Sequence, residues 1–200
     1  MDLTRDALLD LFRRSGALLD GHFRLTSGLH SSGYLQCALV LQHPDHAEAL
    51  GRAIADRTRD LGATVVLSPA LGGVIIGQEL GRALRIRAIF AERQDGALML
   101  RRGFMLADND RVLVVEDVLT TGGSTRETIQ VARAAGAQVV GAASIVDRSG
   151  PSTSSGRAAD LGVPLVSLLE ISLPTYEPGA CPLCAQGVAV VKPGSRPVVA

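Results

Sequence analysis

The chain has 200 residues, of which 46% are hydrophobic, and this is enough for one domain with a covered central sheet. Its 20 basic and 20 acidic residues are dispersed and cancel to a net charge of zero, so no basic surface for nucleic acid is expected. No run of 18 apolar residues and no secretory leader pattern is present, and three cysteines are too few for a disulfide framework. We therefore expect a cytoplasmic protein that contacts neither membrane nor nucleic acid.

The first 43 residues predict a helix followed by a hairpin. Residues 4–19 have the apolar spacing of an amphipathic helix, with Thr4 as the N-cap. Residues 21–44 alternate apolar and polar positions around two Ser-Gly pairs, which favours a β-hairpin-like excursion. Its apolar contacts would include Tyr34 and Leu35, and an aromatic ring at a hairpin edge can either pack in the core or cover a flat ligand.

Residues 44–84 predict a helix closed by Gly62, a strand at 63–67, a loop at 68–73 and a second helix to Leu84. The loop contains Ala70, Leu71, Gly72 and Gly73 and connects the carboxyl end of a strand to a helix. Backbone N–H groups at a helix N-terminus bind anions, so this loop is a candidate anion-binding site.

The segment after the next strand, residues 87–93, predicts a surface excursion of two strands, 97–100 and 101–104. Arg93, Arg101 and Arg102 are the cations available here. Because only Lys192 among the basic residues is lysine, anions will be bound by arginine. Arg101 and Arg102 can also be explained as a solvated surface pair.

The most informative stretch is RVLVVEDVLTTGGSTRE, residues 111–127. Its apolar run, residues 112–115, predicts a buried parallel strand that ends at Glu116 and Asp117. Thr120, Thr121, Gly122, Gly123 and Ser124 then begin a helix that stops at Gly136, which makes a second phosphate-binding loop.

The acid pair argues against a simple phosphate site, because carboxylates repel phosphate. Carboxylates do bind ribose hydroxyls, and they can hold a hydrated Mg²⁺. The common nucleotide motifs G-x-x-x-x-G-K-[ST] and G-x-G-x-x-G are absent. A ligand with a 5′-phosphate beside a ribose would satisfy both the loop and the acids.

The remainder predicts a strand at 138–146, followed by Asp147 and Arg148 at the ligand edge of the sheet, and a last core strand at 165–169. Arg148 can alternatively be a surface cap. Cys181 and Cys184 form a C-x-x-C, which is half of a zinc ribbon. We expect reduced thiols in a tail here, in preference to a metal shared across a dimer.

Two of these segments carry a resemblance to a known family. VLVVEDVLTTGGS resembles the 5-phosphoribosyl 1-diphosphate (PRPP) motif of the type I phosphoribosyltransferases, and SGLHSSGY resembles the base-covering hood segment of orotate phosphoribosyltransferases. The resemblance covers residues 21–150. It implies an α/β fold of that type, a central parallel sheet flanked by helices, with an N-terminal hood. The chain would be a single phosphoribosyltransferase domain, with residues 1–43 as helix and hood, 44–170 as PRPP-binding core and 171–200 as C-terminal tail.

The resemblance also implies residue roles. PRPP would be bound by Arg93 and by the motif residues, which are Glu116, Asp117, Val118, Leu119, Thr120, Thr121, Gly122, Gly123 and Ser124. Pyrophosphate would lie on Ala70, Leu71, Gly72 and Gly73, and orotate on Thr120, Arg148, Tyr34 and Leu35. Glu116, Asp117, Arg101 and Arg102 would be the catalytic groups.

The chain departs from the family in three places. Many orotate enzymes have a lysine where this chain has Thr26 and another where it has Gly72, and their mobile loop carries a lysine and a histidine that residues 94–110 lack. Arginines or backbone N–H groups would have to replace them.

The implied activity is transfer of the phosphoribosyl group of PRPP to orotate, which gives orotidine 5′-monophosphate and pyrophosphate. Mg²⁺ would be held through PRPP and water, without direct protein ligands. A homodimer with shared active sites is implied. A purine or xanthine phosphoribosyltransferase and a non-catalytic PRPP-sensing regulator remain as alternatives.

Overall fold

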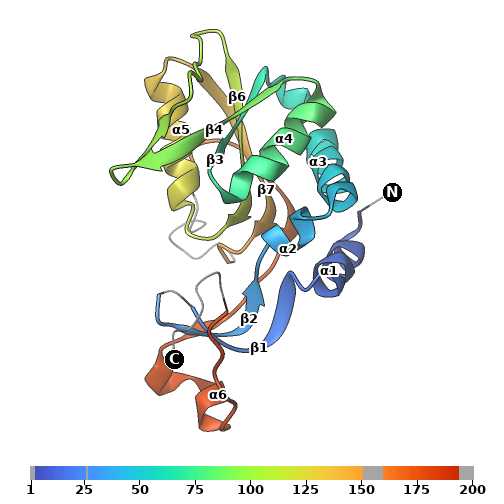
Figure 1. Cartoon of the computed structure of the whole chain (residues 1–200), viewed down its shortest axis with the longest axis vertical. Helices are drawn as coiled ribbons and strands as arrows, with labels where there is room; N and C mark the ends of the chain where they lie inside the picture. Colours follow the sequence, from blue (N-terminus) through green and yellow to red (C-terminus); the bar gives the residue numbers. More distant parts are fainter. Residues whose placement is uncertain (1–2, 26, 151–159, 194–200) are drawn as a thin grey trace.

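The computed structural model describes residues 3–25, 27–150 and 160–193. Figure 1 shows two parts, a larger one around a six-stranded sheet and a smaller one around a three-stranded sheet that contains both early and late segments of the chain. In the described ranges, no helix is long and apolar enough to cross a membrane.

The six-stranded sheet has the order β5-β4-β3-β6-β7-β8. All neighbours are parallel except β4 and β5, which are antiparallel. The strands are β3 (Val65–Pro69), β4 (Arg87–Gln94), β5 (Ala97–Leu100), β6 (Arg111–Leu119), β7 (Gln138–Asp147) and β8 (Leu165–Glu170). The α/β class and the parallel core expected from the sequence are thus confirmed.

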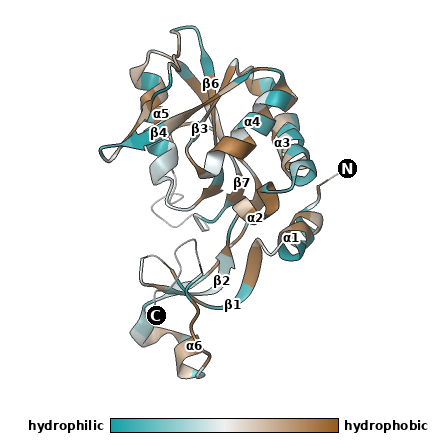
Figure 2. Cartoon of the chain, viewed as in Figure 1, coloured by the Kyte–Doolittle hydropathy of each residue, from teal (hydrophilic) through white to brown (hydrophobic). Residues whose placement is uncertain are grey.

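Helices cover both faces of this sheet. On one face, α3 (Pro44–Thr58) and α4 (Gly72–Leu84) form a buried hydrophobic cluster with Val66, Leu113 and Val115. On the other face, α5 (Gly123–Ala134) forms a second buried cluster with the alternate residues of the same strands, Val65, Leu67, Val112 and Val114. Successive side chains of a strand point to opposite faces, and both faces are buried here. That is why residues 112–115 of β6 form an unbroken apolar run in the sequence. Figure 2 shows the hydrophobic colour on the central strands and also on parts of α4 and α2.

The first helix is shorter than predicted. α1 (Arg5–Arg14) begins at the expected N-cap, where the Thr4 hydroxyl accepts a hydrogen bond from the Ala7 N–H over 3.3 Å. It stops at Ser15 and Gly16, and Gly16 has φ +69°. Leu19 therefore lies in a strand and is exposed, which corrects its assignment to the helix.

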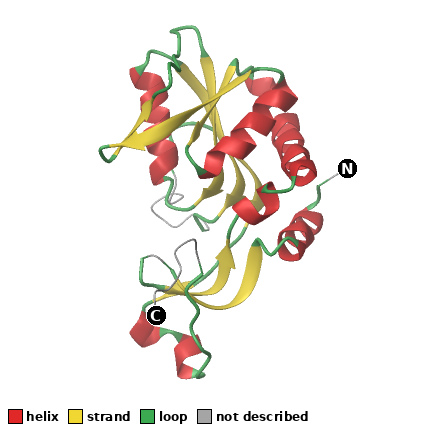
Figure 3. Ribbon diagram, viewed as in Figure 1, coloured by secondary structure: helices red, strands yellow, loops and turns green. Residues whose placement is uncertain are grey.

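The smaller sheet contains the predicted hairpin and one strand from the tail. β1 (Leu18–Arg24) pairs with β2 (His30–Leu35), and β2 pairs with β9 (Thr175–Tyr176), all antiparallel. A short helix, α2 (Ala38–Leu41), connects this sheet to α3, and α6 (Pro182–Ala185) lies beyond β9. Figure 3 shows the three-stranded sheet below the larger one, and we call the assembly of β1, β2, β9 and residues 177–193 the hood.

The surface excursion forms a different hairpin from the predicted one. β5 pairs with β4 through a two-residue turn at Asp95 and Gly96, both with positive φ. Asp-Gly is a preferred pair for such turns because both central residues must adopt positive φ. Residues 101–104 form a turn rather than a second strand, so that prediction is wrong.

Candidate active site

The site lies where the winding of the large sheet reverses. From β3 the chain goes outward to β4, then returns to the other side of β3 as β6 and continues to β7. At such a point the loops after two neighbouring parallel strands separate and leave a crevice at the carboxyl edge. Here these are the loop after β3 and the loop after β6, the two predicted anion-binding loops.

The loop after β6 presents an open helix N-terminus. Gly122 is the N-cap of α5 with φ +73°, a left-handed conformation that glycine adopts without strain, and no side chain caps the helix. The first N–H groups of α5 are therefore free of a side-chain acceptor, and together with the aligned peptide dipoles they favour an anion. Thr120 and Thr121 are exposed beside them.

Glu116 and Asp117 lie within β6, which extends to Leu119 and is thus longer than the apolar run indicated. Burial raises the pKa of Glu116 to about 7, against the opposing effect of a hydrogen bond donated by the Thr125 hydroxyl. Burial also raises the pKa of Asp117, while the N–H groups of Val118 and of Asp117 itself lower it. Neither carboxylate forms an ion pair with any residue that the structure describes.

The loop after β3 faces this acid pair. Leu71 is 87% exposed, the Ala70–Leu71 peptide bond is cis, and α4 starts at Gly72 without a side-chain cap. A cleft of about 340 Å³ connects the loop with Asp117 and with the end of the hood. Its lining residues are Gln36, Ala38, Leu41, Leu71, Gly72, Ile75 and Asp117.

Gly72 lies directly against the Asp117 carboxylate. A Cβ atom built on Gly72 would be 2.6 Å from Oδ1 of Asp117, and no real Cβ contact is that short. Any side chain at position 72 would therefore require the Asp117 carboxylate to shift from this position.

Arg148 lies at the same edge of the sheet. It follows β7, and its backbone N–H donates to the Leu119 carbonyl over 2.7 Å, which places it beside the end of β6. Its Nε atom is buried and has no hydrogen-bond partner within the described ranges, and burial lowers the pKa of the guanidinium. A partly buried guanidinium whose Nε lacks a partner among the described residues can bind an anionic group of a ligand.

The three arginines of the β4–β5 region differ in their contacts. Arg93 pairs with Glu127 of α5 over 2.9 Å and also donates to the Gly96 carbonyl. Arg102 donates two hydrogen bonds of 2.7 Å to Glu92, and its guanidinium lies 5.9 Å from the centre of the Phe90 ring. Arg101 is exposed. Their roles in binding and catalysis stay predictions.

Two hood residues assigned to orotate lie on β2. The Tyr34 ring is half-buried and 5.8 Å from that of Phe23, so it packs within the hood. The Leu35 side chain is buried in the core, so a ligand could reach only its main chain. Thr26, the other position where a family lysine is missing, lies outside the described residues.

Sequence reasoning missed Thr125 and Gln36. Thr125 is one turn into α5, and only the fold shows that its hydroxyl reaches back to Glu116. Gln36 directly follows β2 and lines the cleft. The only sequence feature that could have indicated either residue is that it lies next to a recognised motif.

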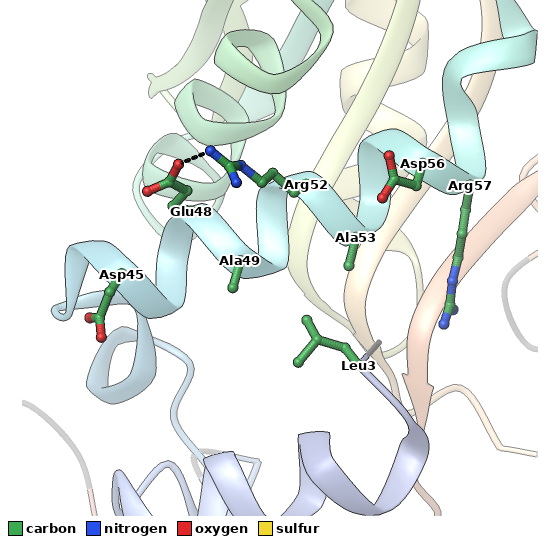
Figure 4. Close-up of a pocket in the computed structure, with 8 residues that line it drawn as sticks. All are labelled: Leu3, Asp45, Glu48, Ala49, Arg52, Ala53, Asp56 and Arg57. Atoms are coloured by element: carbon green, nitrogen blue, oxygen red, sulfur yellow. Dashed lines mark hydrogen bonds and ion pairs between the residues drawn. The ribbon is translucent and has the colours of Figure 1, made fainter. Parts of the chain in front are cut away.

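A larger hollow, of about 770 Å³, lies along α3 next to Leu3. Figure 4 shows its lining of small and charged side chains, among them the Arg52–Glu48 ion pair of 2.5 Å. None of the predicted site residues lines it. We therefore assign the functional site to the smaller cleft at the sheet edge.

Comparisons with known proteins agree with this geometry. Residues 38–155 match the family of the phosphoribosyl transferase domain. The chain is 51% identical to an orotate phosphoribosyltransferase from Pelotomaculum thermopropionicum, over 98% of this chain and all of that one. The Mycobacterium tuberculosis orotate phosphoribosyltransferase bound to Fe(III) dicitrate superposes with a TM-score of 0.68 and 26% identity, over 84% of this chain and 96% of that one. The complex of the same enzyme with PRPP superposes with a TM-score of 0.63 and 27% identity, over 83% of this chain and 95% of that one.

Proposed function

The chain belongs to the orotate phosphoribosyltransferases of the phosphoribosyl transferase family, and from this premise we propose how its own residues carry out the reaction. The enzyme transfers the phosphoribosyl group of PRPP to orotate, which yields orotidine 5′-monophosphate and pyrophosphate in pyrimidine synthesis. The relatives at about 50% identity carry this name, which favours it over a purine enzyme or a PRPP-sensing regulator.

PRPP would lie across the crevice between the two loops. Its 5′-phosphate would accept hydrogen bonds from the N–H groups at the start of α5 and from the hydroxyls of residues 120–124. Glu116 and Asp117 would accept hydrogen bonds from the ribose hydroxyls, with Val118 and Leu119 forming the adjoining backbone. The carboxylates suit this role because they have no basic partner in the described structure.

The diphosphate would lie on the loop after β3, on the N–H groups at the start of α4. Mg²⁺ would be held there through PRPP and water, with the acid pair nearby, and the chemistry it supplies when bound is neutralisation of the departing diphosphate. Glu116 and Asp117 have no cationic partner among the described residues, so they are available to the ribose hydroxyls and to the hydrated metal ion. Burial raises the pKa of both carboxyl groups, and a bound cation would favour their ionised forms.

The bond from C1′ to the diphosphate breaks before the bond to the base is well formed, so positive charge develops on the ribose. The residues around PRPP then act mainly by orienting it and by electrostatic stabilisation. Orotate is already an anionic nucleophile, so little proton transfer is needed. The absence of a lysine and a histidine from residues 94–110 is consistent with this, and Arg101 and Arg102 would be the cations that approach the diphosphate.

Arg148 would determine the choice of base. Its planar guanidinium can donate two parallel hydrogen bonds to the orotate carboxylate, a group that uracil and hypoxanthine lack. Thr120 and the hood residues Tyr34 and Leu35 would complete the base site. We also propose a cytoplasmic homodimer in which the β4–β5 hairpin of one subunit reaches the site of the other.

The single observation that carries the base assignment is the unpartnered Nε of Arg148 beside the PRPP loop. Arg148→Ala should lower kcat/KM for orotate by at least ~100-fold, or about 2.7 kcal/mol, because it leaves a buried carboxylate without a counterion. PRPP binding in the absence of base should change little. Steady-state assays with orotate, uracil, hypoxanthine and xanthine, and calorimetry with PRPP, measure both.

Arg133→Ala is the matched control, since Arg133 is exposed in the last turn of α5. Arg133→Ala should leave kcat/KM for orotate and the affinity for PRPP unchanged. Equal losses for orotate and PRPP in Arg148→Ala would assign Arg148 a structural role instead.

A further inference from the structure

Four side chains outside the active site converge on one point in the hood. They are His22 on β1, His30 on β2, and Cys181 and Cys184 in the α6 turn. One nitrogen or sulfur atom of each lies within 4.8 Å of the corresponding atom of every other. Three of the four residues are buried, and Cys184 is at the surface.

Three of the distances between these atoms match the edges of a zinc tetrahedron. Zinc bonds of about 2.0–2.1 Å to nitrogen and about 2.3 Å to sulfur give edges of about 3.3–3.8 Å. The separations from His22 Nε2 to the Cys181 and Cys184 sulfurs are 3.5 and 3.8 Å, and that from His30 Nδ1 to the Cys184 sulfur is 3.3 Å. The two nitrogens are 2.9 Å apart and would separate slightly around a metal.

Ordinary hydrogen bonding does not account for this convergence. His22 Nδ1 is 2.7 Å from the Val188 carbonyl, which can only accept, so Nδ1 carries the proton and Nε2 of the neutral ring has a single lone pair. Three groups nevertheless surround Nε2, namely His30 Nδ1 and the two sulfurs. A hydrogen bond from the other ring nitrogen to a carbonyl is also what orients a metal-binding histidine.

The strand geometry aims these histidines at the cysteines. The β1–β2 register is irregular between Asp20 and Phe23, and such a bulge redirects the side chains within it, here including His22. His30 lies opposite Arg24 of β1 and Tyr176 of β9, at the centre of the small sheet. The backbone therefore brings together four residues that are separated by up to 162 positions in the sequence.

The hood has little else to hold it together. Neither buried hydrophobic cluster of the described residues includes any position between 19 and 34 or beyond 173. Val188, Val190 and Val191 are exposed, although the Val191 N–H donates to the His22 carbonyl over 2.8 Å. Small structural units without a sufficient core commonly depend on disulfides or metals.

We propose that His22, His30, Cys181 and Cys184 of one chain bind a structural Zn²⁺ ion that fastens the C-terminal segment to the hood. Two thiolates and two imidazoles in a tetrahedral arrangement favour zinc over the hard cations Mg²⁺ and Ca²⁺. All four coordination positions come from the protein, so the ion has no open position for a substrate. The site is independent of the proposed Mg²⁺ at the sheet edge and of the transfer reaction.

Elemental analysis of the full chain, purified without chelator, should give one zinc per chain. Cys184→Ser and His22→Ala should each reduce this to below about 0.1 equivalent under the same buffer conditions. His43→Ala is the matched control and should retain full zinc, because His43 is an exposed histidine at the start of α3. If a variant fails to fold, the wild-type chain exchanged into Co²⁺ gives the second measurement. It should show the intense visible bands of tetrahedral cobalt and a thiolate charge-transfer band.

Removal of zinc with a strong chelator should lower Tm by roughly 5–15 °C and expose the amides of β1 and β2 to hydrogen exchange. Adding Zn²⁺, but not Mg²⁺, should restore both. Wild-type protein that neither contains zinc nor takes up cobalt would overturn the proposal. So would full zinc content in Cys184→Ser, or a mass lower by two hydrogens that reveals a Cys181–Cys184 disulfide.

Discussion

Replacing Gly72 with alanine tests the arrangement of the acid pair with a single added methyl group. The new Cβ would be 2.6 Å from Asp117 Oδ1, whereas ordinary contact begins at 3.4 Å, so the carboxylate must move by about 0.8 Å. A misplacement of about 1 Å in a site that works by orientation can cost about 100-fold. We expect Gly72→Ala to lower kcat/KM for PRPP by about 10- to 100-fold, which is about 1.4–2.7 kcal/mol.

Stability separates this effect from general damage. Gly72 is the first residue of α4 and does not have a positive φ, so alanine adds no backbone strain there and Tm should change little. Gly179→Ala is the control, since a Cβ there meets nothing within 4 Å. Steady-state kinetics with varied PRPP, together with thermal unfolding, provide the readout. A Gly72→Ala enzyme with wild-type kinetics would refute the conclusion that Asp117 requires glycine opposite it.

Three further predictions concern the same site and the assembly. Asp117→Asn should weaken PRPP binding by about 1–3 kcal/mol in calorimetry, and unchanged affinity would remove the ribose-binding role. Because the pKa of Glu116 is about 7 in the folded chain, against 4.5 for an unperturbed glutamate, the native state holds a proton that the unfolded state releases between these values. The free energy of unfolding should therefore fall by up to about 3 kcal/mol as pH rises from about 4.5 to 7, and urea unfolding of Glu116→Gln should lack this component. Sedimentation at micromolar concentration should give a dimer, and a fully active monomer would contradict the shared site.

The parts of the fold that could be predicted are those with local signals. The apolar run before Glu116, the glycines at 122 and 123 and the stop at Gly136 each have a local physical meaning, and together they specify β6, the loop and α5. The carboxyl-edge position of Arg148 follows from the strand before it. These features depend on neighbours in sequence, so one sequence suffices to recognise them.

What could not be predicted depends on long-range packing. The Asp95-Gly96 turn is visible in the sequence, but whether β5 pairs with β4 or with residues 101–104 depends on which strand edge is free. The closeness of Gly72 to Asp117 arises only when β3 and β6 become neighbours. The C-x-x-C is recognisable in the sequence, yet its two histidines lie at the other end of the chain, so the sequence alone indicates only a tail.

The composition of the small sheet has a consequence for synthesis. Its first two strands, β1 and β2, leave the ribosome before any of the large sheet, whereas β9 and the segment that pairs with His22 and Arg24 follow the whole core. Until then β1 and β2 form a hairpin with unpaired edges, the kind of surface through which chains associate wrongly. The small sheet is therefore completed only after the strands of the large sheet have been made.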